Sequence, residues 1–246
     1  MGGDNTLNDF RHIPRKRFGQ HWLKDQGVLD QIVKAAELNP EDCVLEVGPG
    51  KGALTEKLIE SQARFIQAIE LDRDLVIGLK KRFSHQNKFS LREGDILSAP
   101  LDAENGLTIN KVVANIPYNI TGPLLKRLIG ELRKAPDNCF ETLVLLMQKE
   151  VAQRLLAIPG TSNFSALSVR IQLLAKCQDV CDVPSKCFQP APKVDSKVVM
   201  IKPFASSEPD FYEVGNLLEK LLKHAFAGRR KNYETRLEVL LLPTIK

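Results

Sequence analysis

The sequence predicts a doubly wound α/β fold with a mainly parallel sheet. Short, continuously apolar segments recur between residues 43 and 146, amphipathic helical patterns separate them, and a glycine-rich loop directly follows the first apolar segment. Strands that are apolar on both faces are typical of parallel sheets covered by helices on both sides. A chain of 246 residues with 43% hydrophobic content can bury such a core in one or two domains.

The first elements alternate regularly. An amphipathic helix is predicted over 27–37, with an apolar face made of Val28, Leu29, Ile32, Val33 and Ala36. Buried strands are predicted at 43–47, 65–69, 89–92, 111–114 and 142–146. Helices are expected to begin at Ala53 and to span 122–133.

The later elements are expected to complete the sheet and to start a second unit. Segments 179–183 and 197–201 are predicted to close the sheet edge as a hairpin-like pair, joined by a proline-rich loop. Residues 203–209 have the composition of a linker. An amphipathic helix is predicted over 211–227, with Gly228 as its C-cap.

The ends of the first three strands carry groups that suit a nucleoside cofactor. The first strand runs into the glycine loop 48–52, where main chain can approach a ligand because no Cβ collides. Glu70 ends the second strand about 20 residues later, where an acid can hold ribose hydroxyls. Asp95 follows the third strand and can accept from an adenine amine. The Glu46-x-Gly-x-Gly-x-Gly spacing together with these two acids favours S-adenosylmethionine.

Two alternatives compete with this interpretation. Gly48, Gly50 and Ala53 also satisfy the looser G-x-G-x-x-A pattern of dinucleotide-binding folds, although no hydride-transfer constellation follows. Glu70 or Asp95 could instead be a structural helix cap.

The fourth strand ends in Asn115-Ile116-Pro117-Tyr118, a pattern suited to holding a nucleobase amine. Such an amine is a poor nucleophile, so an enzyme that alkylates it must supply hydrogen-bond acceptors and a stacking face. The Asn115 amide oxygen and a main-chain carbonyl beside Pro117 can accept the two N–H bonds, while Tyr118 stacks on the base. Pro117 biases Ile116 towards an extended conformation. The alternative is an ordinary strand-to-helix loop with a buried tyrosine.

From Arg15 to about Lys231 the chain resembles the KsgA family of small-subunit ribosomal RNA adenine N6,N6-dimethyltransferases. The matching stretches are Phe18-Gly19-Gln20-His21-Trp22-Leu23, Glu46-Val47-Gly48-Pro49-Gly50-Lys51-Gly52, Glu70-Leu71-Asp72, Gly94-Asp95, Asn115-Ile116-Pro117-Tyr118-Asn119-Ile120, Leu146-Met147-Gln148-Lys149-Glu150, and Phe188-Gln189-Pro190-Ala191-Pro192-Lys193-Val194-Asp195-Ser196.

The resemblance implies a domain organisation. It implies a flexible tail at 1–13, a seven-stranded, Rossmann-like S-adenosylmethionine-dependent methyltransferase domain at 14–203, and a small helical domain at 204–246. After Lys231 the chain reads Asn-Tyr-Glu-Thr-Arg where the family has a Thr-Leu-Arg-Asn-like run. The helical domain is therefore expected to be shortened or altered there.

The resemblance also implies residue roles. The implied cofactor-binding residues are His21, Leu23, Gly48, Gly50, Glu70, Asp95 and Asn115. The implied catalytic and base-contacting residues are Asn115, Pro117, Tyr118 and Phe188. For Phe188 the alternative is a core aromatic between prolines, and for His21 it is a surface histidine.

The resemblance further implies the activity and its setting. The expected reaction is S-adenosylmethionine-dependent dimethylation of the N6 amines of two adjacent adenosines near the 3′ end of 16S rRNA, in a pre-30S particle, by a cytoplasmic monomer. Two rivals remain open: a large-subunit rRNA adenine N6-methylase of the antibiotic-resistance kind, and a non-catalytic ribosome assembly factor on the same fold. Pro49 and the Lys-Val-Asp-Ser run ending at Ser196 favour the small-subunit family.

Charge and cysteine content agree with an RNA-binding protein of a reducing compartment. The net charge is +5, and basic residues cluster at Arg11, Arg15, Lys16 and Arg17, at Lys126, Arg127, Arg133 and Lys134, and at Lys220, Lys223, Arg229, Arg230 and Lys231. Each cluster alone could be a solvated surface, but together they predict a salt-sensitive RNA footprint. The five cysteines lack a paired C-x-x-C or a histidine partner, so no zinc site is expected. No apolar run approaches the ~18 residues of a membrane span.

Overall fold

The computed structural model describes residues 20–136, 138–204 and 214–227. The predicted tail at 1–13, most of the predicted linker and the altered segment after Lys231 lie outside the described residues. The two boundaries of the methyltransferase domain stay predictions.

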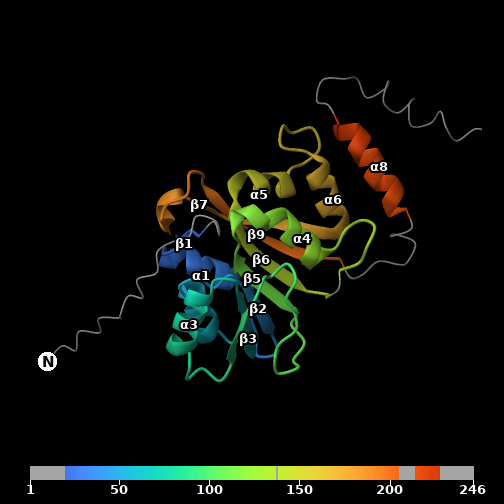
Figure 1. Cartoon of the computed structure of the whole chain (residues 1–246). Helices are drawn as coiled ribbons and strands as arrows, with labels where there is room; N and C mark the ends of the chain where they lie inside the picture. Colours follow the sequence, from blue (N-terminus) through green and yellow to red (C-terminus); the bar gives the residue numbers. More distant parts are fainter. Residues whose placement is uncertain (1–19, 137, 205–213, 228–246) are drawn as a thin grey trace, which may run out of the picture.

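A seven-stranded sheet with the order β4-β3-β2-β5-β6-β9-β7 forms the centre of the fold (Figure 1). Its five parallel strands are β2 (Cys43–Val47), β3 (Phe65–Glu70), β4 (Phe89–Glu93), β5 (Lys111–Asn115) and β6 (Thr142–Gln148). The predicted doubly wound α/β class is confirmed. It follows from the apolar strands, whose core residues must be covered on both faces.

The last two strands pair antiparallel, as predicted, but their order in the sheet differs from a simple edge hairpin. β9 (Ser196–Pro203) lies between β6 and β7 (Ala175–Val183), so only β7 forms the edge. Because β9 runs against the parallel strands, its first residue lies at the edge where they end. The proline-rich loop therefore enters the same end of the sheet as the glycine loop.

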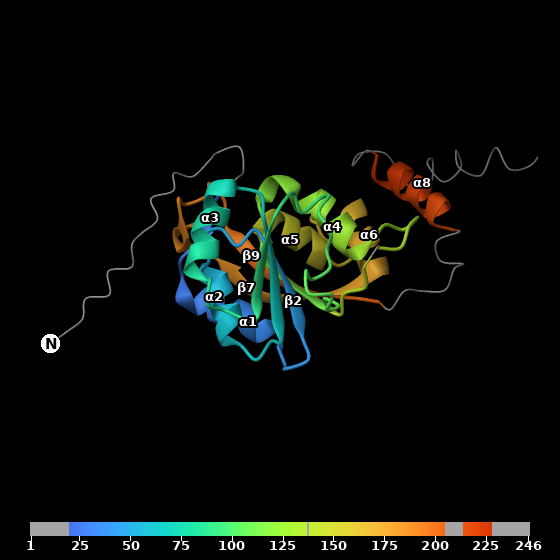
Figure 2. The same cartoon turned by 60° about the horizontal axis from the view of Figure 1, so that its bottom comes forward.

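Helices cover both faces (Figures 1 and 2). The helices α1 (Gln26–Ala35), α2 (Ala53–Glu60) and α3 (Arg73–Arg82) pack on one face, and α4 (Thr121–Ile129), α5 (Lys149–Leu156) and α6 (Ala166–Leu174) pack on the other. Alternate residues of each strand serve the two faces: Val44 and Val113 contact the α1–α2 layer, whereas Leu45 and Val112 contact the α4–α6 layer.

The predicted helix over 122–133 was too long. It ends at Gly130, whose φ of +92° is a left-handed conformation that side chains rarely adopt. Lys134 and Glu131 then form a tight turn with an isolated bridge. The apolar pattern continued past the glycine because Leu132 is also buried, in the turn rather than in a helix.

The helix α8 (Gly215–Phe226) is the last described element and packs on α6. Arg170 on α6 donates three hydrogen bonds of 2.8–3.1 Å to the carboxylate of Glu219 on α8. A Cβ added to Gly215 would lie 1.9 Å from the carbonyl oxygen of Leu132, so the helix can start this close to the α4 turn only with a glycine. Among the described residues, no helix has the length and apolarity needed to cross a membrane.

Candidate functional site

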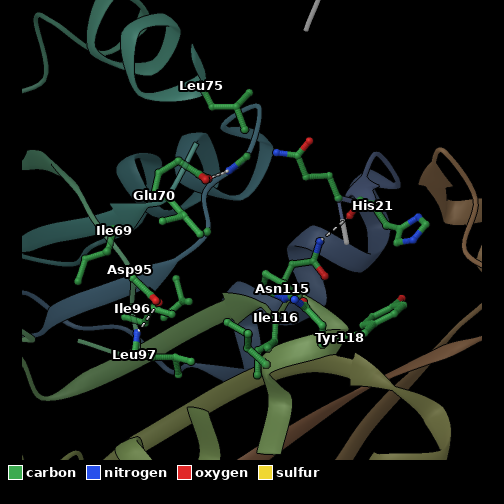
Figure 3. A pocket seen from close by; sticks show the side chains of 18 of the residues that line it. His21, Ile69, Glu70, Leu75, Asp95, Ile96, Leu97, Asn115, Ile116 and Tyr118 are labelled. Atoms are coloured by element: carbon green, nitrogen blue, oxygen red, sulfur yellow. Dashed lines mark hydrogen bonds between the residues drawn. The ribbon is translucent and has the colours of Figure 1, made fainter. Parts of the chain in front are cut away.

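A cavity of about 350 Å³ opens where β2, β3 and β5 end and the segment after β4 begins. Its size falls in the range of small-molecule sites, about 300–1,000 Å³. Glu70 and Asp95 lie at one side of it and His21, Asn115 and Tyr118 at the other (Figure 3). Ligands of open α/β sheets bind at this end of the strands.

The glycine loop forms part of the cavity wall. Gly48 and Gly50 have φ values of +63° and +60°, which glycine adopts without strain. A Cβ on Gly50 would lie 2.8 Å from Cδ1 of Trp22, so this glycine is also required for close packing. The loop therefore leaves main chain, rather than side chains, facing the ligand space.

Glu70 is fixed by the main chain around it. Its two carboxylate oxygens accept hydrogen bonds from the backbone N–H groups of Gly50 (3.1 Å) and Asp72 (2.9 Å). Burial raises the pKa of this carboxyl above its ordinary value, and the two backbone donors oppose the rise. A carboxylate offers about four acceptor positions, so lone pairs remain for ligand hydroxyls.

Asp95 lies on a loop that is held by a side chain of helix α4. One carboxylate oxygen accepts from the backbone N–H of Leu97 at 2.9 Å, which leaves the second oxygen for a ligand. The guanidinium of Arg127, on α4, donates to the carbonyls of Ile96 and Ala99 in the same loop. The sequence predicts Arg127 as part of a basic RNA-binding cluster; in the structure its guanidinium supports the Asp95 loop.

Asn115 ends β5 and faces both the cavity and the N-terminal segment. Its side-chain N–H₂ donates to the carbonyl of His21 at 3.0 Å. Its side-chain oxygen accepts no hydrogen bond from any described residue. The next residue, Ile116, donates its backbone N–H to the carbonyl of Leu146 at 3.0 Å, which ties the turn to β6. The amide oxygen of Asn115 thus has no donor among the described residues and is available as an acceptor.

Tyr118 forms the aromatic wall of the cavity. Its hydroxyl lies 2.6 Å from that of Ser196, and its ring stacks on the imidazole of His21, with centroids 5.7 Å apart and an interplanar angle of 22°. Nδ1 of His21 donates to the carbonyl of Pro190 at 2.8 Å. Burial raises the pKa of Tyr118, and the hydrogen bond from Ser196 opposes the rise.

A short two-stranded sheet joins two distant segments beside the cavity. We call it the strap: it consists of β1 (Trp22–Leu23) paired antiparallel with β8 (Phe188–Gln189). Two residues before the strap, Nε2 of Gln20 donates to Asp72 at 3.0 Å, so the chain that enters the strap is attached to the N-cap residue of α3. No local pattern in the sequence predicts that these two segments pair.

Most of the predicted site residues line the cavity. They are His21, Gly48, Gly50, Glu70, Asp95, Asn115, Pro117 and Tyr118. The two others, Leu23 and Phe188, face each other in the strap and lie in the core with 5% and 2% of their surface exposed. For Phe188 this is the position of the core-aromatic alternative, and its contact with a base stays a prediction.

One buried acid beside the site was not predicted. Glu46 is 1% exposed, and both of its carboxylate oxygens lack a hydrogen-bond partner among the described residues, as does the hydroxyl of Thr55. Burial raises the pKa of Glu46 to about 8. The nearby hydroxyl of Thr55 opposes this rise, and the negative charge of Glu70 adds to it. Burial therefore favours the protonated form of Glu46 at neutral pH.

The cysteines and acids of the described segments do not form a metal centre. These segments contain no group of three or more His, Cys, Asp or Glu side chains arranged to hold a metal ion, and all five cysteines are free thiols.

The donor and acceptor set fits S-adenosylmethionine. Glu70 can accept from ribose hydroxyls, Asp95 from an adenine amine, and the glycine loop leaves the main chain open to the amino-acid end. The apolar side chains of Ile69, Leu75 and Ile96 line the same cavity and suit the faces of a purine ring.

Comparison with known proteins gives consistent matches. The family model "Ribosomal RNA adenine dimethylase" matches residues 11–245. Ribosomal RNA small subunit methyltransferase A of Prochlorococcus marinus (strain NATL2A) is 98% identical over 231 residues, which are 94% of this chain and 79% of the relative. The protein of the same name from Synechococcus sp. (strain CC9902) is 58% identical over 234 residues, covering 95% of this chain and 85% of the relative.

Solved structures agree with the fold. A dimethyladenosine transferase from Plasmodium falciparum is 34% identical, with a TM-score of 0.74 over 89% of this chain and 75% of the other. The 23S rRNA methyltransferase ErmE is 27% identical, with a TM-score of 0.69 over 89% of this chain and 84% of the other.

Proposed function

This chain belongs to the ribosomal RNA adenine dimethylase family, and on that premise we propose that it dimethylates the N6 amines of two adjacent adenosines near the 3′ end of 16S rRNA, using S-adenosylmethionine. The substrate is a pre-30S particle in the cytoplasm, and the enzyme acts as a monomer. One observation carries the proposal: the amide oxygen of Asn115, which accepts from no described residue, lies in the same cavity as the two acids Glu70 and Asp95.

The cofactor is held by residues at three strand ends. Glu70 accepts from the ribose hydroxyls, Asp95 accepts from the adenine amine, and Gly48 and Gly50 leave room for the methionine end. His21 lines the cavity and would contact the cofactor directly, whereas Leu23, buried in the strap, would support that contact. When bound, S-adenosylmethionine supplies an electrophilic methyl group on a sulfonium.

Asn115 and the turn after it bind the target amine. The Asn115 oxygen and the Ile116 carbonyl, neither of which has a donor among the described residues, accept its two N–H bonds. Pro117, which has no N–H, keeps a competing donor out of this turn. These acceptors direct the nitrogen lone pair towards the methyl group and stabilise the positive charge that develops as the new bond forms. The proton then passes to solvent.

The target base must leave its stack in the RNA to reach the Tyr118 ring and the acceptors beside it. Extruding a base costs a few kcal/mol, which stacking on Tyr118 offsets in part. The described basic side chains near α8 hold the RNA backbone by neutralising phosphates. They are Lys126, Arg133, Lys134, Lys220 and Lys223, which we call the α8 basic face.

The rivals make different predictions about substrate. The likeness to ErmE supports a large-subunit methylase, whereas the relatives named for the small subunit match at higher identity. A non-catalytic assembly factor would not need the free acceptor of Asn115, which argues against that rival.

The test is to incubate the chain with methyl-labelled S-adenosylmethionine and either undermethylated 30S particles or naked large-subunit RNA. We expect labelled N6,N6-dimethyladenosine in 16S rRNA only. Label in the large-subunit RNA instead would favour the resistance-type methylase. Binding to 30S particles without any label, under conditions where cofactor binds, would favour the assembly factor.

A further inference from the structure

Ser196 is a buried residue of the Lys-Val-Asp-Ser run that takes no part in the proposed chemistry. It is fully buried, and its hydroxyl lies 2.6 Å from the hydroxyl of Tyr118. The two residues are far apart in the chain: one begins β9, and the other begins a short 3₁₀ helix (Tyr118–Ile120) directly after Pro117. The bond therefore joins the proline-rich loop to the residue assigned to base stacking.

The support on the Ser196 side is rigid. As the first residue of β9 it is paired with Gln148 on β6 and with Val183 on β7, so strands hold it on both sides. The preceding residue, Asp195, adds two more contacts: its carboxylate accepts from the backbone N–H of Ser185 at 2.9 Å, and its carbonyl accepts from that of Lys149 at 3.0 Å. Position 196 is thus held by two neighbouring strands and by the contacts of the residue before it.

The Tyr118 ring needs such a support. It is only partly buried and belongs to a single 3₁₀ turn, in which no residue is fully buried. The ring also stacks on His21, but His21 lies beside the strap and not on the central sheet. Without the bond at its hydroxyl, the ring would be free to tilt about its side-chain torsions, because aromatic rings rotate in broad energy wells.

We propose that Ser196 is a positioning residue, which fixes the plane of the Tyr118 ring so that the target adenine stacks with its amine against the Asn115 and Ile116 acceptors. The inference rests on the proposed function and deepens it. A small error in base placement lowers the reaction rate strongly, because transfer needs the nitrogen and the methyl carbon in line. Ser196 itself touches neither the base nor the cofactor.

A purely structural role would have other consequences. If the hydroxyl of Ser196 only satisfied a buried polar group, its loss would lower the stability of the protein and leave the rate per folded molecule unchanged. Removing the bond from the tyrosine side, by Tyr118→Phe, keeps the ring and removes the same contact. The two single variants and the double variant therefore measure the coupling.

The experiment measures the single-turnover rate of methyl transfer to undermethylated 30S particles at saturating RNA and cofactor, together with the cofactor dissociation constant. We expect Ser196→Ala and Tyr118→Phe each to lower the rate about fivefold, as expected for one hydrogen bond. The double variant should be no slower than the slower single variant, and cofactor affinity should be unchanged in all three. Ser196→Thr, which keeps the hydroxyl, should recover most of the rate per folded molecule.

Ser168→Ala is the matched control. Ser168 is also fully buried and hydrogen-bonded, but it belongs to the capping box of α6. The Ser168→Ala variant should have a lower free energy of unfolding but an unchanged rate of methyl transfer per folded molecule.

Three results would overturn the proposal: a normal rate for folded Ser196→Ala, a normal rate for Tyr118→Phe, or single effects that multiply in the double variant. If the unmodified protein transfers no methyl group to 30S particles, the proposed function fails, and this inference with it. If the unmodified protein is active and the variants keep its rate, only the inference fails.

Discussion

The side-chain N–H₂ of Asn115 donates a 3.0 Å hydrogen bond to the main-chain carbonyl of His21, so the end of β5 is tied to the residue that directly precedes the strap. The two ends of this amide differ in their contacts. Its nitrogen bonds to His21, and its oxygen, which accepts from no described residue, is left for the proposed contact with the target amine. The orientation of the oxygen depends on the bond made by the nitrogen, because the amide is planar.

Replacing Asn115 by alanine should lower methyl transfer by about a hundredfold or more, since it removes a preorganised transition-state contact. Cofactor binding should persist, because Glu70 and Asp95 remain. Single-turnover transfer and calorimetric titration with cofactor would measure the two effects. Asn163→Ala, at an exposed position, is the control. A near-normal rate in Asn115→Ala would contradict the assigned role.

Replacing Arg127 by alanine should weaken cofactor binding about tenfold. The guanidinium donates to the carbonyls of Ile96 and Ala99, and charge-assisted bonds of this kind hold the Asp95 loop in place. The dissociation constant for S-adenosylhomocysteine, measured by calorimetry, would show the change. Lys126→Ala is a control one residue away, since Lys126 reaches Glu131 at the surface. If Arg127→Ala weakened only RNA binding, this residue would belong to the basic RNA-binding cluster that the sequence predicts.

The cofactor-free protein should lose stability as pH rises towards 8, and Glu46→Gln should remove that part of the loss. The pKa of Glu46 is raised from 4.5 to about 8 by burial. Between these values the native state keeps a proton that the unfolded chain releases, so rising pH favours unfolding by up to about 1.4 kcal/mol per pH unit from this group. Below pH 4.5 Glu46 is protonated in both the native and the unfolded state, and above about pH 8 it is ionised in both, so outside this range it adds no pH dependence.

Urea unfolding of both proteins at pH 5, 6, 7 and 8 would measure this effect, with the exposed Glu41→Gln as a control. The free energy of unfolding of Glu46→Gln should rise relative to the unmodified protein as pH increases. An equal difference at pH 5 and at pH 8 would show that Glu46 does not titrate in this range.

Replacing Lys220 and Lys223 by glutamine should weaken RNA binding and reduce its salt dependence. These lysines belong to the α8 basic face, and removing each phosphate contact should reduce the slope of log affinity against log salt by about 0.7–0.9. Filter binding of rRNA fragments between low and moderate salt would give the slopes. Lys34→Gln is the control, because α1 lies far from α8 (Figures 1 and 2). Identical slopes for the double variant and the unmodified protein would exclude this face from the RNA footprint.

The central sheet and the site residues at the carboxyl ends of its strands could be predicted from the sequence because their signals are local. A strand that is buried on both faces must be apolar throughout, and groups at its carboxyl end must meet the ligand space, so the sequence alone places Glu70, Asp95 and Asn115 together. The glycine pattern likewise placed Gly50 in the cavity wall, and the structure adds the reason that only glycine fits against Trp22 there.

The missed features depend on pairings between distant residues. Two-residue strands such as Trp22–Leu23 have no periodicity from which they could be recognised, and their pairing with Phe188–Gln189 is visible only in three dimensions. Arg127 was assigned to the surface because a basic residue on an amphipathic helix is usually solvated, whereas here it reaches two carbonyls of a neighbouring loop. The protonation of Glu46 depends on the depth of its burial, which the glycine motif does not encode.

The strap also constrains the order in which the protein can mature during translation. Its first strand leaves the ribosome early, but the strand that pairs with it is made only near the end of the sheet-forming region. A nascent chain can therefore assemble the glycine loop and both acids while the pairing of β1 with β8 and the hydrogen bond from His21 to Pro190 are still unmade. The strap can form only when Phe188 and Gln189 have emerged, so a chain stopped before them would lack this pairing beside the cavity.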